Sequence, residues 1–304
     1  MRKRFTETEI NTWRRQGAVL IADFFSPQEI SAPLLDAERI FAGCAKGTGW
    51  GWPRKRKRKG SIGEFQPEQL KNMVQIPVDC SPALNLLGLH PALIELARAA
   101  LRTDDVHAYQ LFAWAKYTGQ ADYDQPFHCD YTNHTLTVPA DDNRLNAINI
   151  MIYLTDVTDG HGAIHYVPLP DSDTIVRDRM IVPDSERQLS LKTHERSGAS
   201  GAGSIFVYGI DVYHRGTNLT VPKGRRYTFT ASYKAAGNDM IGYSAWPVSC
   251  EKPWHRIFEN ATPDQLACLG VPRPGADFWT ERTIRRAQDR WPGWDMSAYR
   301  SNHA

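Results

Sequence analysis

The spacing of hydrophobic positions changes character near residue 106. Before this point, apolar residues recur at helical intervals, as in "PALIELARAAL" at 91–101. After it, short apolar or alternating runs are separated by turn signals such as "DGHG" and "VPKG". These runs are "VHAYQLFAWAKY", "LNAINIMIYLTDV", "GAIHYVPL", "SIFVYGIDVYH" and "RRYTFTASYK". The pattern predicts helices first and strands afterwards.

Local signals sharpen the first part of this prediction. Thr6 and Glu9 form a capping box, and Gly17 supplies a stop, so "TETEINTWRRQG" reads as a helix. The stretch "AVLIADFF" at 18–25 reads as a buried strand. The stretch "SPQEI" at 26–30 combines an N-cap serine, a first-turn proline and a second capping box, which opens another helix.

Several strands that follow a helical entry favour a mainly β fold, a barrel or sandwich with helices packed outside. No linker rich in Pro, Gly or Ser divides the chain, so we expect one domain over residues 1–304. Within it we expect a barrel core at about 106–235, a helical N-terminal support at 5–105 and a C-terminal surface extension at 236–304.

Composition narrows the classes of protein. The chain has 304 residues, 41% of them hydrophobic, and its 36 basic and 34 acidic residues give a net charge of +2. No global charge therefore favours nucleic acid or membrane partners, and no apolar run approaches the ~18 residues of a membrane span. Five scattered cysteines without a CxxC motif favour a reducing cytoplasm.

The basic run "RKRKRK" at 54–59 is either a solvated loop or a clamp for an anion.

Three residues are candidates for a metal site. In "PFHCDYTNH" (126–134), an extended backbone would point His128 and Asp130 to the same side. Alone, such a doublet is more often an ordinary solvated pair. His214, at the end of an apolar run and before a turn, is the best third donor, and two imidazoles with one carboxylate suit Fe(II) with open positions. We expect His134, His161 and His165 not to be ligands.

The run "RRYTFTASY" has two different faces. Arg226, Thr228, Thr230 and Ser232 alternate with Tyr227, Phe229, Ala231 and Tyr233. The aromatic face should pack against helices, which leaves the polar face, with Arg226 at its mouth, toward the barrel interior. A guanidinium there can bind a carboxylate through two hydrogen bonds. Arg225 is the alternative, because a slip of one residue exchanges the two faces.

These segments, in this order, resemble the phytanoyl-CoA dioxygenase family. The resemblance rests on "PFHCD", "INIMIYLTDVTDGHGAIHYVP" and "GSIFVYGIDVYHRGTNLTVPKGRRYTFTASY", with "GAVLIADFFSPQEI" similar to the family's usual opening. It implies a double-stranded β-helix (jelly-roll, cupin-like) barrel with Fe(II) on His128, Asp130 and His214. It also implies 2-oxoglutarate on Arg226 or Arg225, with Thr228 beside it. Lys116 matches a recurrent family lysine that could equally be a solvated charge.

The resemblance implies an Fe(II)- and 2-oxoglutarate-dependent dioxygenase that uses O2 to oxidise C–H bonds of a small-molecule substrate. A carboxylate at position 130 leaves no position for chloride, so we expect oxygen insertion, desaturation or ring formation and not halogenation. Two alternatives stay open: a nucleic-acid demethylase that uses the basic run, and a non-catalytic binding barrel. The sequence does not indicate the substrate or the oligomeric state.

Overall fold

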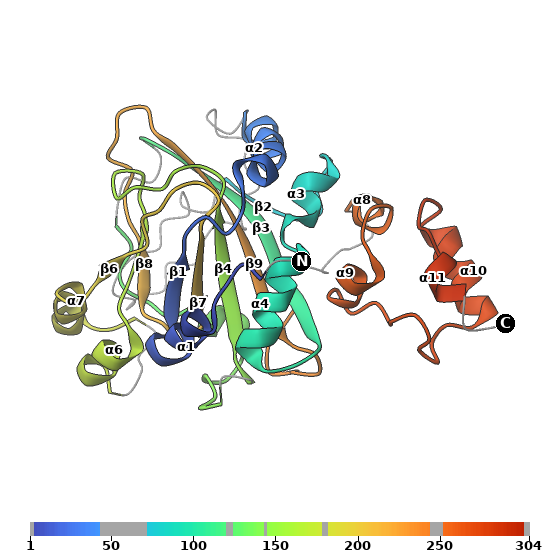
Figure 1. Cartoon of the computed structure of the whole chain (residues 1–304). Coiled ribbons are helices and arrows are strands. Elements are labelled where there is room, and N and C mark those ends of the chain that lie inside the picture. The colour runs from blue at the N-terminus through green and yellow to red at the C-terminus, as the bar shows by residue number, and fades with distance from the viewer. Residues whose placement is uncertain are drawn as a thin grey trace.

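The structure is a computed structural model, and it describes residues 3–42, 72–119, 124–142, 145–177, 182–243 and 252–300. The basic run at 54–59, Cys44 and Cys250 lie outside these ranges. Two antiparallel sheets form the centre of the fold (Figure 1). The six-stranded sheet has the order β1-β7-β4-β9-β3-β2, and the three-stranded sheet has the order β6-β5-β8. The fold is a mainly antiparallel double-stranded β-helix, as the family resemblance implied.

The strands differ greatly in length. The longest, β3 and β9, pair with each other almost from end to end, and β9 also pairs with β4. The strands are β1 (Ala18–Ile21), β2 (Met73–Gln75), β3 (Val106–Tyr117), β4 (Ala147–Tyr153), β5 (Ile164–Tyr166), β6 (Arg196–Ser197), β7 (Ile205–Gly209), β8 (His214–Gly216) and β9 (Arg225–Ala235).

Helices precede, interrupt and follow the strands. Those before β3 are α1 (Glu7–Gln16), α2 (Pro27–Phe41), α3 (Pro82–Leu87) and α4 (Pro91–Leu101), and those between strands are α5 (Tyr131–His134), α6 (Leu169–Ile175) and α7 (Ser185–Lys192). After β9 come α8 (His255–Phe258), α9 (Pro263–Ala267), α10 (Glu281–Arg290) and α11 (Ser297–Arg300). Both predicted capping boxes are present, at Thr6 and at Ser26, and Gly17 ends α1 in the left-handed conformation.

The N-terminal helices cover the outer face of the large sheet, where α4 contacts β3, β4 and β9 (Figure 1). The outward side chains of β9, Tyr227, Phe229, Ala231 and Tyr233, are buried in the same core cluster as Leu93 and Leu96 of α4. This confirms the prediction that the aromatic face of β9 packs against helices. Side chains of a strand alternate between its two faces, so Tyr227, Phe229, Ala231 and Tyr233 all lie on one face of β9 and bury it against the helices.

Two predicted strands are shorter than their apolar runs. In "AVLIADFF" only Ala18–Ile21 pairs, and the chain then turns at Asp23, whose φ is 50°. In "SIFVYGIDVYH" the strand β7 ends at Gly209, and the amide of Val212 bonds the Gly209 carbonyl across a turn. His214 therefore does not end this strand but begins β8 in the other sheet. Hydrophobic spacing could not reveal the break, since both sides of the turn are buried.

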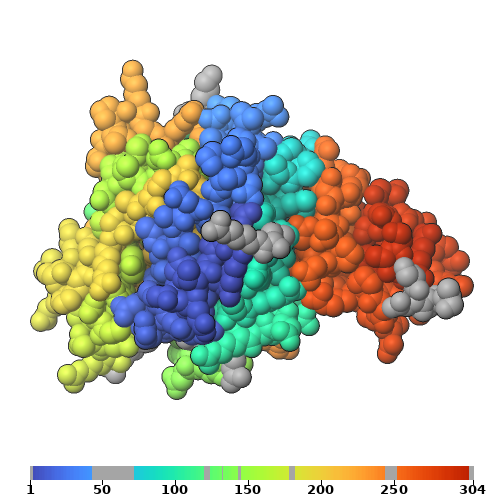
Figure 2. Space-filling model, viewed as in Figure 1, coloured from blue at the N-terminus to red at the C-terminus, as the bar shows by residue number. Residues whose placement is uncertain are grey.

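Residues 252–300 form a helical lobe beside the barrel, seen at the red end of the chain in Figure 2. Its aromatic side chains Trp279, Trp294 and Tyr299 are buried, and they belong to the same core cluster as the helices that cover the large sheet.

One segment, Pro82–Leu101, has the length and composition of a membrane span. It is interrupted between α3 and α4, and 67% of its window is buried inside the protein. Such burial is typical of core helices.

Candidate metal centre

Main-chain pairing brings the two candidate histidine ligands together. His128 and His214 form an isolated antiparallel bridge, in which each amide donates to the carbonyl of the other residue at 3.0 Å. Their imidazole rings consequently lie side by side, with centroids 4.5 Å apart. Both histidines are buried, with 7% and 5% of their surface exposed. Residues 86 positions apart in the chain, 128 and 214, thus meet at one point of the barrel.

Asp130 completes the cluster from a different local structure. It has a helical conformation (φ −80°, ψ −12°) at the start of α5, so the stretch around it is not a continuous strand. Its Oδ1 lies 3.9 Å from Nε2 of His128 and 3.6 Å from Nε2 of His214. All three donor atoms lie within 4.8 Å of one another, and within the described ranges no other group of three or more His, Cys, Asp or Glu side chains is placed to hold an ion.

The hydrogen bonds of the two rings fix which nitrogen can bind a metal. Nδ1 of His128 lies 2.9 Å from the carbonyl of Pro126, and Nδ1 of His214 lies 3.0 Å from the carbonyl of Val212. A carbonyl only accepts, so both Nδ1 atoms carry the proton and both Nε2 atoms present a lone pair. Burial, and then His214, lower the pKa of His128 to about 4, which keeps this ring neutral. Two imidazoles beside one carboxylate fit a divalent transition metal.

Two side chains that sequence reasoning missed hold the other oxygen of Asp130. Nδ2 of Asn149 and the hydroxyl of Tyr208 donate to Oδ2 at 3.5 and 3.4 Å. Burial alone would raise the pKa of Asp130, but the imidazoles of His214, His134 and His128 together keep it below its usual value. Asn149 left a signal in the sequence, because it is a lone amide in the buried strand "AINIMIY" and a buried amide needs partners.

A polar network continues from Asn149 across the barrel interior. Its Oδ1 accepts a hydrogen bond of 2.7 Å from the hydroxyl of Ser232 on β9. Tyr109 reaches the same region because a register shift between Ala108 and Gln110 interrupts the alternation of β3. The hydroxyl of Tyr109 bonds Nδ1 of His134, which is buried beside the cluster and is not one of its three donors.

A pair of buried cations lies on the interior faces of β3 and β9. Lys116 and Arg226 are directly opposite in the register of the two strands, and they are 5% and 4% exposed. Nζ of Lys116 and Cζ of Arg226 lie 5.4 and 5.9 Å from the ring centroid of Trp114. Among the described residues, neither cation forms an ion pair with a carboxylate. Two like charges this close together are unfavourable without a compensating anion.

Burial changes the ionisation of both groups. It lowers the pKa of Lys116 to about 7, with the charge of Arg226 as a further cause, and it lowers the pKa of Arg226 to about 10. Thr228 follows on the same face of β9. Its hydroxyl oxygen and Nε of Arg226 are buried without a hydrogen-bond partner in the described part of the protein. The guanidinium of Arg226 does donate to the carbonyl of Gly162. Unsatisfied donors beside two cations are typical of a pocket that binds a carboxylate.

The alternative arginine faces the other way. Arg225 is 58% exposed on its side chain and forms an ion pair of 2.7 Å with Glu38 of α2. Its position follows from the register, because the strand begins at Arg225 and alternation then turns Arg226 inward.

The remaining candidates have structural partners. His161 bonds the hydroxyl of Thr158 in a turn, and His165 lies on β5, 3.2 Å from Asp159. Cys129, between the two ligands, donates its thiol to the carbonyl of Asp211. Arg215, next to His214, binds Glu195 through two hydrogen bonds and Asp124 at 2.8 Å.

A double-stranded β-helix that holds two imidazoles and one carboxylate at one point defines the class of non-haem metal-dependent barrels. The chain belongs to the phytanoyl-CoA dioxygenase (PhyH) family, whose model matches residues 13–227. No curated protein matches the sequence significantly.

Solved structures share the fold at low identity. The chain is similar to EctD from S. alaskensis in its apoform, with 18% identity, a TM-score of 0.58 and coverage of 83% of this chain and 84% of that one. It is similar to the α-ketoglutarate-dependent carbocyclase SnoK from nogalamycin biosynthesis, with 18% identity, a TM-score of 0.55 and coverage of 76% and 85%. The α-ketoglutarate-dependent epimerase SnoN from the same biosynthesis has 17% identity, a TM-score of 0.55 and coverage of 76% and 82%.

We predict that His128→Ala, Asp130→Ala and His214→Ala each weaken Fe(II) binding by more than about 100-fold. Loss of a residue that only hydrogen-bonds a metal ligand costs up to about 100-fold, so loss of the ligand itself should cost more. The measurement is anaerobic titration with Fe(II), with circular dichroism as the test of folding. His194→Ala, at an exposed histidine just after α7, is the matched control and should bind iron like the unmodified protein. Wild-type affinity in any one of the three variants would remove that residue from the site.

Proposed function

We propose that the protein is a non-haem Fe(II)- and 2-oxoglutarate-dependent dioxygenase that oxidises C–H bonds of a small organic metabolite. The observation that carries this proposal is the presence of two complementary sites in one barrel interior. One is a three-donor cluster with both Nε2 atoms available, and the other is a buried cation pair without a carboxylate partner in the described residues. A molecule with an anionic group at one end and metal-binding oxygens at the other satisfies both.

In this proposal His128, Asp130 and His214 hold the iron, and Oδ1 of Asp130 is its carboxylate donor. When bound, iron and 2-oxoglutarate supply the oxidative chemistry, in which one O2 converts 2-oxoglutarate to succinate and CO2 and places one oxygen on the substrate. The protein orients its ligands: the carbonyls of Pro126 and Val212 fix the two rings. Asn149 and Tyr208 fix the carboxylate through its other oxygen.

The cation pair is the proposed site for the distal carboxylate of 2-oxoglutarate. Arg226 offers its unpartnered Nε and Lys116 its ammonium, while the hydroxyl of Thr228 offers a third donor. Charge-assisted hydrogen bonds of this kind are strong where water is excluded. The inward residues Thr230 and Ser232 continue along β9 toward Asn149, and so toward the metal end.

Two comparisons support a small-molecule substrate and this cosubstrate. EctD has been solved with 2-oxoglutarate and 5-hydroxyectoine, and separately with bound Fe. SnoN has been solved with Fe3+, α-ketoglutarate and nogalamycin RO. For the cell, we propose a cytoplasmic location for a single-domain enzyme, which the free thiols of Cys80 and Cys268 support.

We predict that Arg226→Ala weakens 2-oxoglutarate binding far more than Arg225→Ala does. Loss of a buried charge-assisted pair costs on the order of 2 to 4 kcal/mol, or about 30-fold or more. The exposed pair of Arg225 with Glu38 should contribute little. Calorimetric titration of 2-oxoglutarate into the two metal-loaded variants makes the comparison, and the opposite ranking would exclude Arg226 as the carboxylate ligand.

We predict that 2-oxoglutarate affinity falls as the pH rises above 7. The pKa of Lys116 is about 7, so below this pH the ammonium that favours a bound carboxylate is already present. Above it, binding must take up a proton, and Kd rises by up to about tenfold per pH unit. In Lys116→Arg the charge persists, and this rise should be absent. Measuring both proteins with the same metal at each pH cancels the titration of the metal ligands. Equal slopes would show that Lys116 does not contact the anion.

We predict that the Fe(II)-loaded protein consumes O2 and releases succinate from 2-oxoglutarate, and that His214→Ala does not. A metabolite screen scored by succinate and by product mass then identifies the substrate. If that substrate is hydroxylated, its product should carry one oxygen from 18O2. With high chloride or bromide present, no halogen should appear in it, because Asp130 fills the position that a halide would need. Absence of succinate under every condition would contradict the proposed function.

A further inference from the structure

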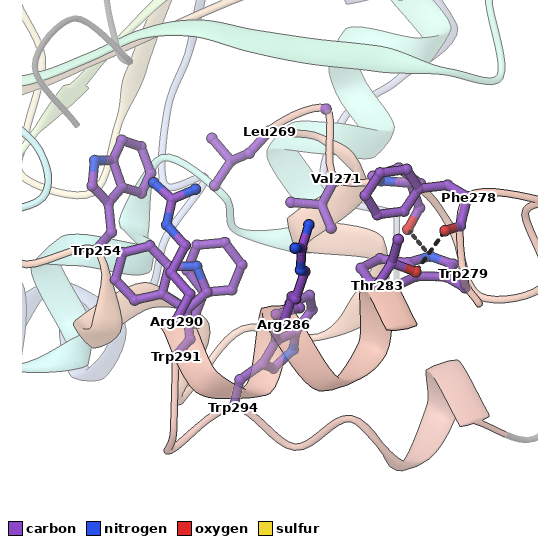
Figure 3. Close-up of a pocket in the computed structure, with 14 residues that line it drawn as sticks. Trp254, Leu269, Val271, Phe278, Trp279, Thr283, Arg286, Arg290, Trp291 and Trp294 are labelled. Atoms are coloured by element: carbon purple, nitrogen blue, oxygen red, sulfur yellow. Dashed lines mark hydrogen bonds between the residues drawn. The ribbon is translucent and has the colours of Figure 1, made fainter. Parts of the chain in front are cut away.

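The C-terminal lobe contains a cleft that the barrel chemistry does not use. The family match ends at residue 227, and the lobe of residues 252–300 follows it. A cavity of about 550 Å3 lies between α8, the loop at 269–272 and α10 (Figure 3). This volume is within the range of sites for small organic ligands.

Six of the fourteen residues that line this cleft are aromatic. They are Trp254, Phe258, Phe278, Trp279, Trp291 and Trp294. Several of them brace one another: Phe258 and Trp291 are stacked at 4.9 Å, and Trp279 and Trp294 meet edge to face at 5.8 Å. Phe278 remains 53% exposed at the edge of the cleft, and its ring meets that of Trp279 edge to face at 4.8 Å. Aromatic rings that line a cleft favour a flat apolar ligand.

The charge of the cleft is of one sign. Arg286 and Arg290 stand four residues apart on α10, and both extend across the cleft toward Trp254, Leu269 and Val271 (Figure 3). None of the lining residues that the structure describes is acidic. Elsewhere in the lobe, Arg256 forms an ion pair with Asp79. Arg273 forms ion pairs with both Asp105 and Asp264. Neither Arg286 nor Arg290 has such a partner among the residues that the structure describes.

We propose that this cleft binds a small aromatic organic anion, a carboxylate or a phosphate ester, with its rings between the tryptophan walls and its anionic group on Arg286 and Arg290. Guanidinium groups bind both kinds of anion through paired hydrogen bonds. Arg290 is already placed over an aromatic face, with its Cζ 5.0 Å from the ring centroid of Trp291, which holds the cation at the rim of the apolar walls. The proposal is independent of the proposed function of the barrel.

The test uses naphthalene-2-carboxylate and 2-naphthyl phosphate as probes, with naphthalene-2-carboxamide as the neutral analogue. The full-length protein is titrated by calorimetry and by quenching of tryptophan fluorescence. We expect at least one anion to bind at least tenfold more tightly than the amide. Whichever anion binds more tightly identifies the preferred group.

Charge-reversed variants locate the binding. Arg286→Glu/Arg290→Glu should weaken anion binding at least tenfold. Arg282→Glu/Arg285→Glu makes the same change in net charge on the same helix, at exposed arginines that do not line the cleft, and should weaken it less than twofold. Phe278→Ala, at the exposed edge, should weaken binding of both anions without affecting the fold.

Three results would overturn the proposal: no binding of either anion at millimolar concentration, equal binding of anion and amide, or equal losses in the two charge-reversed variants. Excess 2-oxoglutarate separates this cleft from the barrel. Anion binding that persists in its presence supports the proposal, and competition would assign the probe to the barrel.

Discussion

Strand β9 lies between β3 and β4. Its side chains alternate, so the even-numbered residues from Arg226 to Lys234 point into the barrel. The residues between them, from Tyr227 to Tyr233, join the core beneath the N-terminal helices. One strand therefore supplies both the polar interior and the apolar layer that stabilises it. A change of register by one residue would exchange the two, so the helical cover and the candidate site depend on the same pairing.

The carboxylate of the metal centre and the Lys116–Arg226 pair carry opposite charges in the barrel interior. Near the metal centre, Asp130 lies beside three imidazoles, and their attraction outweighs the effect of burial on its pKa. In the cation pair, burial lowers the pKa of both Lys116 and Arg226, a sign that the folded protein keeps these cations in a place where their charge is unfavourable. The apolar contacts of the outer face offset this cost. An arrangement of this kind has the polarity that the proposed binding of 2-oxoglutarate requires.

The C-terminal lobe is attached to the body of the protein through polar contacts as well as through its aromatic core. Lys252 donates to the side-chain amide of Gln75 at 2.8 Å, Arg256 pairs with Asp79, and Asp264 accepts from Arg98 of α4. These contacts join the lobe to segments on both sides of α3. The rings that line the cleft between α8 and α10 are therefore held by a frame that extends to the main sheet, which gives the cleft a defined shape.

Much of the fold follows from the sequence because its signals are short-range. Capping at Thr6 and Ser26, the helical spacing of 91–101 and the two faces of 225–235 each depend on neighbours a few residues away. The sequence also singled out His128, Asp130 and His214, which the fold brings together.

Pairing between distant strands decided the rest. Only the register of β9 against β3 turned Arg226 inward and Arg225 toward Glu38, and only that pairing placed Lys116 beside another buried cation. Asn149 and Tyr208 reach Asp130 from two further strands, and the break between β7 and β8 depends on the chain crossing from one sheet to the other. Such contacts join residues far apart in the chain, and hydrophobic spacing carries no information about which of them meet.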